Sequence, residues 1–480
     1  MQTMKIINTI FAACICVSLF SCDLMKPEGI VNPNVDEDAY LNTPNAMETW
    51  VNGTEKSFAQ AIGTFCLHTE IMTDNYFNNY TRESKVFDIP QLLYTDPDIA
   101  TLQRYVGNLR ESADYGIDKV QKHDTNTTRA QLFKLYYIKA YSYILAGENF
   151  RALPVTTGGE PKTWHEQLQL ALQTLDKALE YAVSNTGKAF IHTLKARSYY
   201  RLGDADKAIE EAQSSLNLSD NFIVQVTFDG DNGISNAMQE DIWGTMYQPL
   251  PRLDFLDPKY FQLTSTDQKP ICIAKAEENY LILAEADLAK SRLSDAKSRL
   301  VKLISLVKTR PIQHNLNDQL EGRYNGGFKH YPNSADYVVA ASKDDAYRTG
   351  LVLDRRAPNL ISVPTVSGTS VTEDMVRACT TVDSALELTY LMRQEIFIAE
   401  GRRLADLGIR LPISEVEAAG KPSSAPYTQA LIPAFIPLEQ SMDAFDMDDT
   451  THRVTIRYNM NRVIVENKAT EYVAPFFNKP

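Results

Sequence analysis

The sequence predicts a mainly α-helical protein whose body consists of tetratricopeptide-like helix pairs interrupted by long irregular loops. Two observations indicate this fold class. From Ala46 onward apolar residues recur mostly at helical spacing, without the sustained alternation of apolar strands and crossover helices that a parallel-sheet enzyme shows. Small residues also recur at one fixed interval, as they do in helical-repeat proteins.

Residues 1–21 are typical of an export signal. One charged side chain, Lys5, precedes an apolar run from Ile6 to Phe20 that is too short to span a bilayer. The segment ends in Leu19-Phe20-Ser21-Cys22, which resembles the lipobox of bacterial lipoproteins. We therefore expect lipidation at Cys22, since an acyl anchor holds a protein on a membrane surface without a transmembrane helix. The alternative is an ordinary signal peptide followed by an incidental cysteine.

Residues 22–45 are predicted to be a tether and residues 46–480 a single helical domain. The tether is rich in Pro, Asn, Asp and Glu and has little with which to build a core. Removing residues 1–21 takes away one lysine and no acidic residue, so the net charge of −13 becomes −14. An acidic surface repels phosphate backbones, so nucleic acid is not an expected partner. Cys66, Cys272 and Cys379 are far apart and are expected to be buried apolar residues.

One helix is predicted in detail after Thr163. Thr163 and Glu166 form a capping box at its start. Its apolar stripe consists of Leu168, Leu172, Leu175 and Leu179. Gly187 is expected to end it.

An interval of twelve residues between small side chains predicts antiparallel helix pairs, because small side chains let two helices approach closely. The interval separates Ala196 from Ala208, with Gly203-Asp204 at the turn; Ala284 from Ala296, with Ser291 at the turn; and Ala140 from Ala152, with Tyr143 and Gly147 in register. Three long loop segments interrupt these units, at about 69–97, 228–270 and 311–382. Insertions in repeat proteins gather on one face that usually binds, so these loops are expected to carry the binding face.

Four further segments carry the motifs of a known family. They are Arg393-Gln394-Glu395 with Glu400-Gly401-Arg402-Arg403 and Asp406-Leu407; Lys275, Glu278, Leu281 and Ala284-Glu285-Ala286 leading to Ile304, Val307 and Arg310; Asn149 to Val155; and Phe435 to Glu439. Together they resemble the SusD/RagB family of outer-membrane nutrient-binding lipoproteins, over most of the chain after the signal. The chain departs from the family pattern at Lys275, Ser305, Lys308 and Arg151-Ala152, so it resembles a divergent member.

The resemblance implies a protein that binds a nutrient oligomer, with a glycan as the expected cargo, and passes it to a SusC-like TonB-dependent outer-membrane transporter. It implies no catalytic residues and no cofactor. Asp23, directly after Cys22, resembles the surface-export signal of Bacteroidetes-type lipoproteins, which implies an outer-membrane location facing outward. Peptide or another non-glycan cargo is the alternative. A surface-anchored hydrolase is a third hypothesis, against which the absence of Walker, H-E-x-x-H and G-x-S-x-G motifs argues.

Charged residues from Arg393 to Asp406 are expected to pair along one helix, Glu395 with Arg402 or Arg402 with Asp406. We interpret them as scaffold salt bridges. A glycosidase needs two carboxyl groups that face each other across a sugar, and two acids on one helix do not supply that arrangement.

Candidate ligand-binding residues lie in three aromatic loops. Sugars present apolar C–H faces that stack on aromatic rings and hydroxyl groups that suit Asn, Asp and Arg. The candidates are Asp74, Asn75, Tyr76, Phe77, Tyr80 and Arg82 in the first loop, Trp243 and Tyr247 in the second, and Tyr324, near Tyr331, in the third. Family members that bind glycans do so with aromatic-rich loops, and the first loop has a comparable place in the chain. The alternative is that these rings pack against the helices, and Trp243 in particular follows residues typical of a buried strand.

The segment from Asp229 to Glu240 weakly resembles a calcium loop, because acids stand at its first, third and twelfth positions. Ile234 occupies the position where such a loop needs glycine. A turn rich in Gly and Asp is therefore the preferred interpretation, and no metal is expected.

Overall fold

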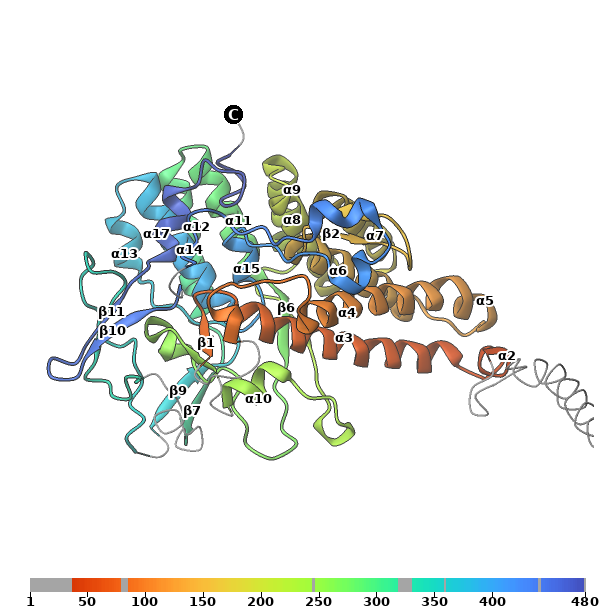
Figure 1. Ribbon diagram of the computed structural model, residues 1–480, viewed down its shortest axis with the longest axis horizontal. Coiled ribbons are helices and arrows are strands. Elements are labelled where there is room, and N and C mark those ends of the chain that lie inside the picture. The colour runs from red at the N-terminus through yellow and green to blue at the C-terminus, as the bar shows by residue number, and fades with distance from the viewer. Residues whose placement is uncertain are drawn as a thin grey trace, which may run out of the picture.

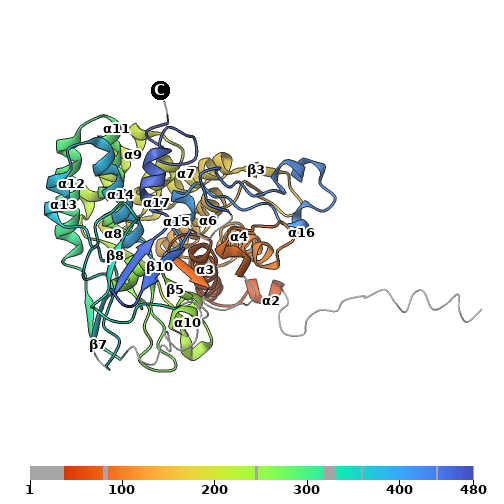
Figure 2. The ribbon, with the colours of Figure 1, turned by 60° about the vertical axis from the view of Figure 1, so that its left-hand side comes forward.

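The computed structural model describes residues 37–78, 85–243, 247–317, 330–357, 360–438 and 442–478. The fold is mainly helical (Figure 1). The long helix α3 (Ala46–Ile71) runs through the middle of the molecule, with the helix pairs on one side of it and loops with short strands on the other (Figures 1 and 2). Among the described residues, no helix combines the length and the apolar character needed to cross a membrane.

Helices account for most of the described residues between 37 and 218 and recur from residue 276 onward. The α-helices are α2 (Glu37–Leu41), α3, α4 (Pro97–Tyr115), α5 (Gln121–His123), α6 (Arg129–Asn149), α7 (Trp164–Tyr181), α8 (Asn185–Arg201), α9 (Ala205–Leu218), α10 (Ala237–Trp243), α11 (Ala276–Ala289), α12 (Leu293–Val307), α13 (Glu373–Ala378), α14 (Val382–Ile396), α15 (Arg403–Asp406), α16 (Glu415–Ala418) and α17 (Met460–Glu466). Shorter helical turns are η1 (Lys85–Asp88), η2 (Gly116–Val120), η3 (Gly230–Asn232), η4 (Pro251–Leu256) and η6 (Pro422–Tyr427).

Short strands connect the loop segments to one another. The antiparallel pairs are β1 (Tyr76–Asn78) with β5 (Tyr247–Pro249), β2 (Ala152–Pro154) with β3 (Pro161–Thr163), β4 (Ile223–Val226) with β6 (Ile271–Lys275), and β7 (Ile312–Leu316) with β9 (Ile361–Pro364). A further sheet has the order β10 (Phe445–Asp448), β11 (Arg453–Ile456), β8 (Val338–Ala340), with β11 and β8 parallel. The pairing of β1 with β5 joins the first predicted loop to the second, so these loops are partly ordered by strands.

Two of the three predicted helix pairs are confirmed. Helices α8 and α9 pack against each other, and Ala196 and Ala208 are fully buried between them. Gly203 has a φ of 69° at the turn, a conformation that favours glycine, and the side chain of Asp204 caps α9. Helices α11 and α12 form the second pair, with Ser291 at the turn.

The third predicted pair, from Ala140 to Ala152, is wrong in its connection. Ala152 lies on strand β2, and α6 pairs with α7 after a β-hairpin. Gly147 lies inside α6, and a Cβ at this position would approach Cγ of Leu168 to 2.6 Å. Glycine is therefore needed here for close packing of α7, and not for a turn.

The predicted capping box of α7 is confirmed, since the Thr163 hydroxyl accepts from the Glu166 N–H and the Glu166 carboxylate accepts from the Thr163 N–H. The predicted end at Gly187 is wrong, because α7 ends at Tyr181. Gly187 lies in the first turn of α8, where its N–H donates to the side chain of Ser184.

Residues 37–45 belong to the folded structure, although the sequence predicts them as tether. Leu41 of α2 is buried, and the carboxylate of Glu37 accepts from Lys119 and Tyr115. Residues 1–36, with the predicted signal and Cys22, lie outside the described residues. The predicted burial of Cys66, Cys272 and Cys379 is confirmed, and all three are free thiols.

Candidate functional site

The charged motif from Arg393 to Asp406 does not form one helix. Helix α14 ends at Ile396, and Ala399 and Gly401 have φ values of 59° and 67° before α15 begins at Arg403. This break removes the helical register, so the predicted pairs of Glu395 with Arg402 and of Arg402 with Asp406 are wrong. Glu395 instead accepts hydrogen bonds from Thr369 and Ser370.

The motif residues form a buried ionic network with partners far away in sequence. Its links are Arg197 with Glu278 at 2.7 Å, Glu278 with Arg402 at 2.8 Å, Arg402 with Glu148 at 3.5 Å, Glu148 with Arg201 at 2.9 Å, Arg201 with Asp406 at 2.9 Å, and Asp406 with Arg393 at 2.9 Å. Burial raises the pKa of Glu278, but the charges of Arg197 and Arg402 outweigh it and hold this pKa at about 2. These carboxylates therefore stay ionised inside the fold, as expected of a scaffold.

The first predicted loop lies in the core where the structure describes it. Asp74 accepts from Arg403 and Gln394, Asn75 donates to Glu70, and the hydroxyl of Tyr76 donates to Asp257. Phe77 packs against Tyr331 and Phe445. All four candidates, from Asp74 to Phe77, are at most 1% exposed, so in this conformation they offer no surface to a ligand. Pairing of β1 with β5 explains this burial, and Tyr80 and Arg82 lie outside the described residues.

The second and third loops also direct their rings inward. Trp243 ends helix α10, not a strand as predicted, and packs against a small apolar cluster that includes Phe261 and Val363. Tyr247 is 4% exposed on β5. Tyr331 is buried and donates to Asp254, while Tyr324 lies outside the described residues.

The predicted turn after Asp229 is confirmed. The side chain of Asp229 accepts a hydrogen bond from the backbone N–H of Asn232, and Gly233 closes the turn with a φ of 71°. Across the described ranges, no group of three or more His, Cys, Asp or Glu side chains is placed to hold a metal ion.

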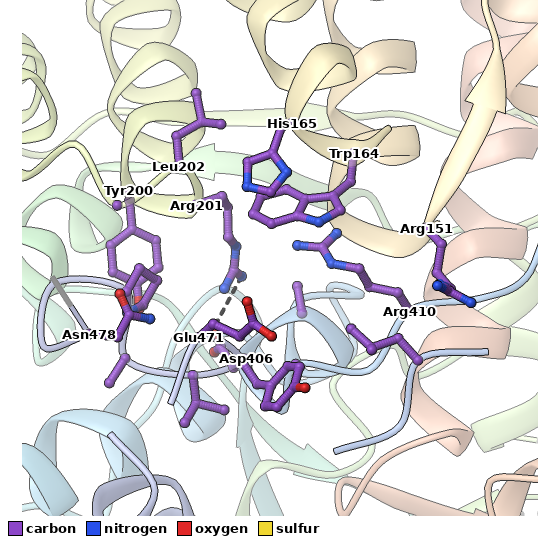
Figure 3. Close-up of a pocket in the computed structure, with 18 of the residues that line it drawn as sticks. Arg151, Trp164, His165, Tyr200, Arg201, Leu202, Asp406, Arg410, Glu471 and Asn478 are labelled. Atoms are coloured by element: carbon purple, nitrogen blue, oxygen red, sulfur yellow. Dashed lines mark ion pairs between the residues drawn. The ribbon is translucent and has the colours of Figure 1, made fainter. Parts of the chain in front are cut away.

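A pocket of about 370 Å³ lies where α7 begins, beside the turn between α8 and α9 (Figure 3). Trp164 and His165 border it from the first turn of α7, and Arg201 reaches it from the end of α8. The segment after α15 contributes Arg410, and the described C-terminal residues contribute Glu471, Tyr472 and Asn478. Arg151 and Tyr427 also border the pocket.

Local hydrogen bonds hold the tryptophan in place. The capping box starts α7 at Trp164, whose N–H donates to the carbonyl of Arg151 at 3.0 Å. Arg151 in turn donates its N–H to the carbonyl of Leu411, one residue beyond Arg410. Trp164 and Arg410 are thus fixed on facing segments of backbone.

Aromatic rings and guanidinium groups alternate along the pocket. Cζ of Arg410 lies 3.9 Å from the centroid of the Trp164 ring, and Cζ of Arg151 lies 5.7 Å from that of Tyr427. Trp164, Tyr427 and Tyr472 are only half-buried, so part of each side chain remains accessible. Accessible rings beside fixed hydrogen-bond donors suit a ligand that has both apolar C–H faces and hydroxyl groups.

Arg410 has an unusual electrostatic environment. Burial lowers the pKa of its guanidinium, and the charge of Arg201 lowers it further, to about 9, against the opposing effect of Glu148. Its Nη1 donates to the carbonyl oxygens of Gly147 and Glu148 near the end of α6. Across the described ranges, no carboxylate forms an ion pair with Arg410.

Sequence reasoning missed this pocket, although two of its residues carried a signal. Arg151 stands at a departure from the family motif, and Trp164 lies inside the capping box. Neither position marks a site until α6, α7 and the segment after α15 are packed together. Tyr427 and Tyr472 carried no motif at all.

A second pocket, of about 600 Å³, lies along α4 and α16. Of the described residues that border it, Tyr94 alone carries an aromatic ring, while Glu111, Glu415 and Glu417 are acidic. It therefore offers less stacking surface to a sugar than the pocket at Trp164.

Comparison with known proteins confirms the SusD-like, tetratricopeptide-based fold. Neither a protein-family model nor a curated protein sequence matches the chain. Among solved structures, a SusD/RagB family protein from Bacteroides thetaiotaomicron matches with a TM-score of 0.52 at 11% identity, over 80% of this chain and 96% of that chain. A SusD superfamily protein from Bacteroides fragilis matches with a TM-score of 0.48 at 15% identity, over 78% and 97% of the two chains. A SusD-like carbohydrate binding protein from the same species matches with a TM-score of 0.45 at 11% identity, over 89% and 99%.

Proposed function

We propose that this chain is a divergent SusD/RagB family member that binds an oligosaccharide at the cell surface and delivers it to a SusC-like TonB-dependent outer-membrane transporter. One observation carries the proposal: a SusD-like fold holds a pocket in which Trp164, Tyr427 and Tyr472 expose rings beside Arg151 and Arg410. Rings of this kind stack on sugar C–H faces, and the guanidinium groups donate to hydroxyl groups.

The lipobox supports the surface location. An acyl chain on Cys22, followed by a short tether, would hold the folded body close to a membrane-embedded partner. Delivery then requires only that the bound oligosaccharide pass from this pocket to the transporter beside it.

Asp406, a carboxylate of the pocket, is unsuited to the acid role that the hydrolase hypothesis requires. Asp406 and Glu471 both border the pocket. Burial acts to raise the pKa of Asp406, but Arg393 and Arg201 outweigh it and hold this pKa well below its usual range. A carboxyl group that stays ionised cannot protonate a glycosidic oxygen, so Asp406 cannot be the general acid that a glycosidase needs.

Calorimetry on residues 22–480 with Cys22→Ser tests the binding role. We expect an oligosaccharide to bind, and Trp164→Ala to weaken binding about 10-fold, which corresponds to about 1.4 kcal/mol of lost stacking. The matched control is Tyr347→Ala, which removes a ring that is 42% exposed and does not border the pocket. Unchanged affinity in Trp164→Ala would exclude this pocket as the site, and binding of peptides alone would replace the glycan cargo while leaving the transport role.

Purification of the lipidated chain from outer membranes in mild detergent tests the partner. We expect a TonB-dependent receptor to copurify. Recovery of the chain alone, under conditions that keep other outer-membrane complexes intact, would contradict the transport role.

A further inference from the structure

The buried ionic network next to the pocket has an excess of positive charge. Within the described chain it contains four guanidinium groups, those of Arg197, Arg201, Arg393 and Arg402, and three carboxylates, those of Glu148, Glu278 and Asp406. Arg410 adds a further positive charge close to Arg201. A buried excess of charge is costly unless an opposite charge compensates it.

A further buried acid beside the network compensates this charge only in part. Glu285 is fully buried and accepts hydrogen bonds from Tyr200 and Tyr390, two residues that border the pocket. Burial raises the pKa of Glu285 to about 7, so at neutral pH it carries only part of a negative charge. Glu471 is ionisable too, but it lies exposed at the pocket, where water and salt screen it.

Arg410 directs its charge into the pocket. Figure 3 shows its side chain extending beneath the ring of Trp164. The side chain is 9% exposed, and its hydrogen bonds within the described residues go only to backbone carbonyls. Nη2 of Arg201 lies 2.9 Å from Asp406 but makes no well-directed hydrogen bond to a described residue. The guanidinium of Arg410 therefore retains donor capacity at the pocket, and Arg201, which is paired with Glu148 and Asp406, lies close to it.

We infer that the pocket selects an oligosaccharide that carries an anionic group, a uronic acid carboxylate or a sulfate, with the anion at Arg410 and a sugar ring against Trp164. Guanidinium groups recognise both carboxylate and sulfate oxygens through parallel N–H donors. The inference rests on the proposed function and names the class of sugar that this site takes.

A glycan array with neutral, uronic acid and sulfated members, probed with residues 22–480 carrying Cys22→Ser, tests this inference. We expect acidic members to be bound. The methyl-esterified or desulfated form of the best ligand is expected to bind at least 10-fold more weakly, and comparison of the two groups distinguishes carboxylate from sulfate. Binding restricted to neutral glycans would overturn the inference and leave the proposed function standing, whereas binding of no glycan would overturn both.

Substitution of Arg410 tests whether its guanidinium group binds the anionic group of the ligand. Arg410→Met is expected to lose at least 10-fold in affinity for the acidic ligand and to lose clearly less in affinity for its neutral form. Arg410→Lys keeps the charge but not the parallel donors, so it is expected to lose less affinity for the acidic ligand than Arg410→Met. This variant keeps the test valid if the methionine variant unfolds. Arg356→Met, at a side chain that is 53% exposed and does not border the pocket, is the control. Equal losses for the acidic and neutral forms would show that Arg410 only supports the fold.

Discussion

Replacing Glu278 by glutamine removes the carboxylate that joins two arginines of the buried network. Arg197 donates to its two oxygens at 2.8 and 2.7 Å, and Arg402 donates at 2.8 Å. Glutamine is similar in size but has no charge and a single acceptor oxygen. Two buried guanidinium groups are then left without their shared counter-ion.

The cost of this change follows from the pKa of Glu278. The folded protein holds this pKa at about 2, because Arg197 and Arg402 outweigh the effect of burial, and the ordinary value is 4.5. At about 1.4 kcal/mol per pKa unit, the difference corresponds to about 3 kcal/mol of folding stability. Loss of one partner from a buried ion pair costs about 3–5 kcal/mol, which agrees with this value. Because the folded pKa is lowered, the stabilisation is complete above pH 4.5 and is lost as the pH falls toward 2.

Urea unfolding of the parent and Glu278→Gln at about pH 7 and about pH 3 measures this effect. We expect Glu278→Gln to be less stable by about 3 kcal/mol at neutral pH, with a smaller difference in acid. Glu180→Gln, which removes an exposed partner of Lys177, is expected to change nothing measurable. A difference below about 1 kcal/mol at neutral pH, or the same difference at both pH values, would refute the account of the network.

Four further substitutions test the packing and the buried groups. Gly147→Ala would bring its Cβ to 2.6 Å from Leu168 and is expected to lower the free energy of unfolding by about 1–3 kcal/mol. Gly53→Ala, whose Cβ would meet nothing within 4 Å, should raise the free energy of unfolding by about 0.5–1 kcal/mol. Equal effects of the two substitutions in urea titrations would contradict the close contact at Gly147. Burial raises the pKa of Glu285 to about 7, so its contribution to stability is present below pH 4.5 and is lost as the pH rises through 7. Glu285→Gln should therefore melt higher than the parent at alkaline pH but not at acidic pH, and an equal difference at both would argue against a raised pKa. Tyr76→Phe removes the hydrogen bond to Asp257 and should lower the free energy of unfolding by about 1.5–3 kcal/mol without changing the affinity for the glycan. A lower glycan affinity at unchanged stability would instead indicate that Tyr76 binds the ligand.

Local features of the fold were predictable because they depend on residues close in sequence. The capping box at Thr163 and the turn at Gly203 each need only a few neighbouring residues, and both are found where the sequence places them. Small residues at the interval of twelve predicted the α8–α9 and α11–α12 pairs for the same reason. The interval beginning at Ala140 failed, because a β-hairpin interrupts the chain before α7.

The long-range contacts could not be predicted from spacing. Arg402 pairs with Glu148 and Glu278, which lie on α6 and α11, because the backbone turns at Ala399 and Gly401. A charge pattern by itself predicts pairing within one helix. The fold overrides that pattern, since the buried guanidinium needs buried carboxylates and the nearest ones belong to other helices.

The same limit applies to the site. The sequence of an aromatic segment with amides and acids is the same whether the segment faces solvent or the core. Here the pairing of β1 with β5 places Tyr76 and Phe77 in the core. Trp164 and Arg410 become neighbours only when α7 packs beside the segment after α15. Arg151, a departure from the family pattern, and Trp164, inside the capping box, were the sequence signals near this pocket.

Calorimetric titration of the parent protein and Trp164→Ala with the best ligand from the glycan array measures whether the pocket at Trp164 binds the sugar. We expect the parent to bind an oligosaccharide at one site and Trp164→Ala, at unchanged thermal stability, to bind it about 10-fold more weakly. Equal affinity in the two proteins, or binding of no oligosaccharide by the parent, would contradict this expectation.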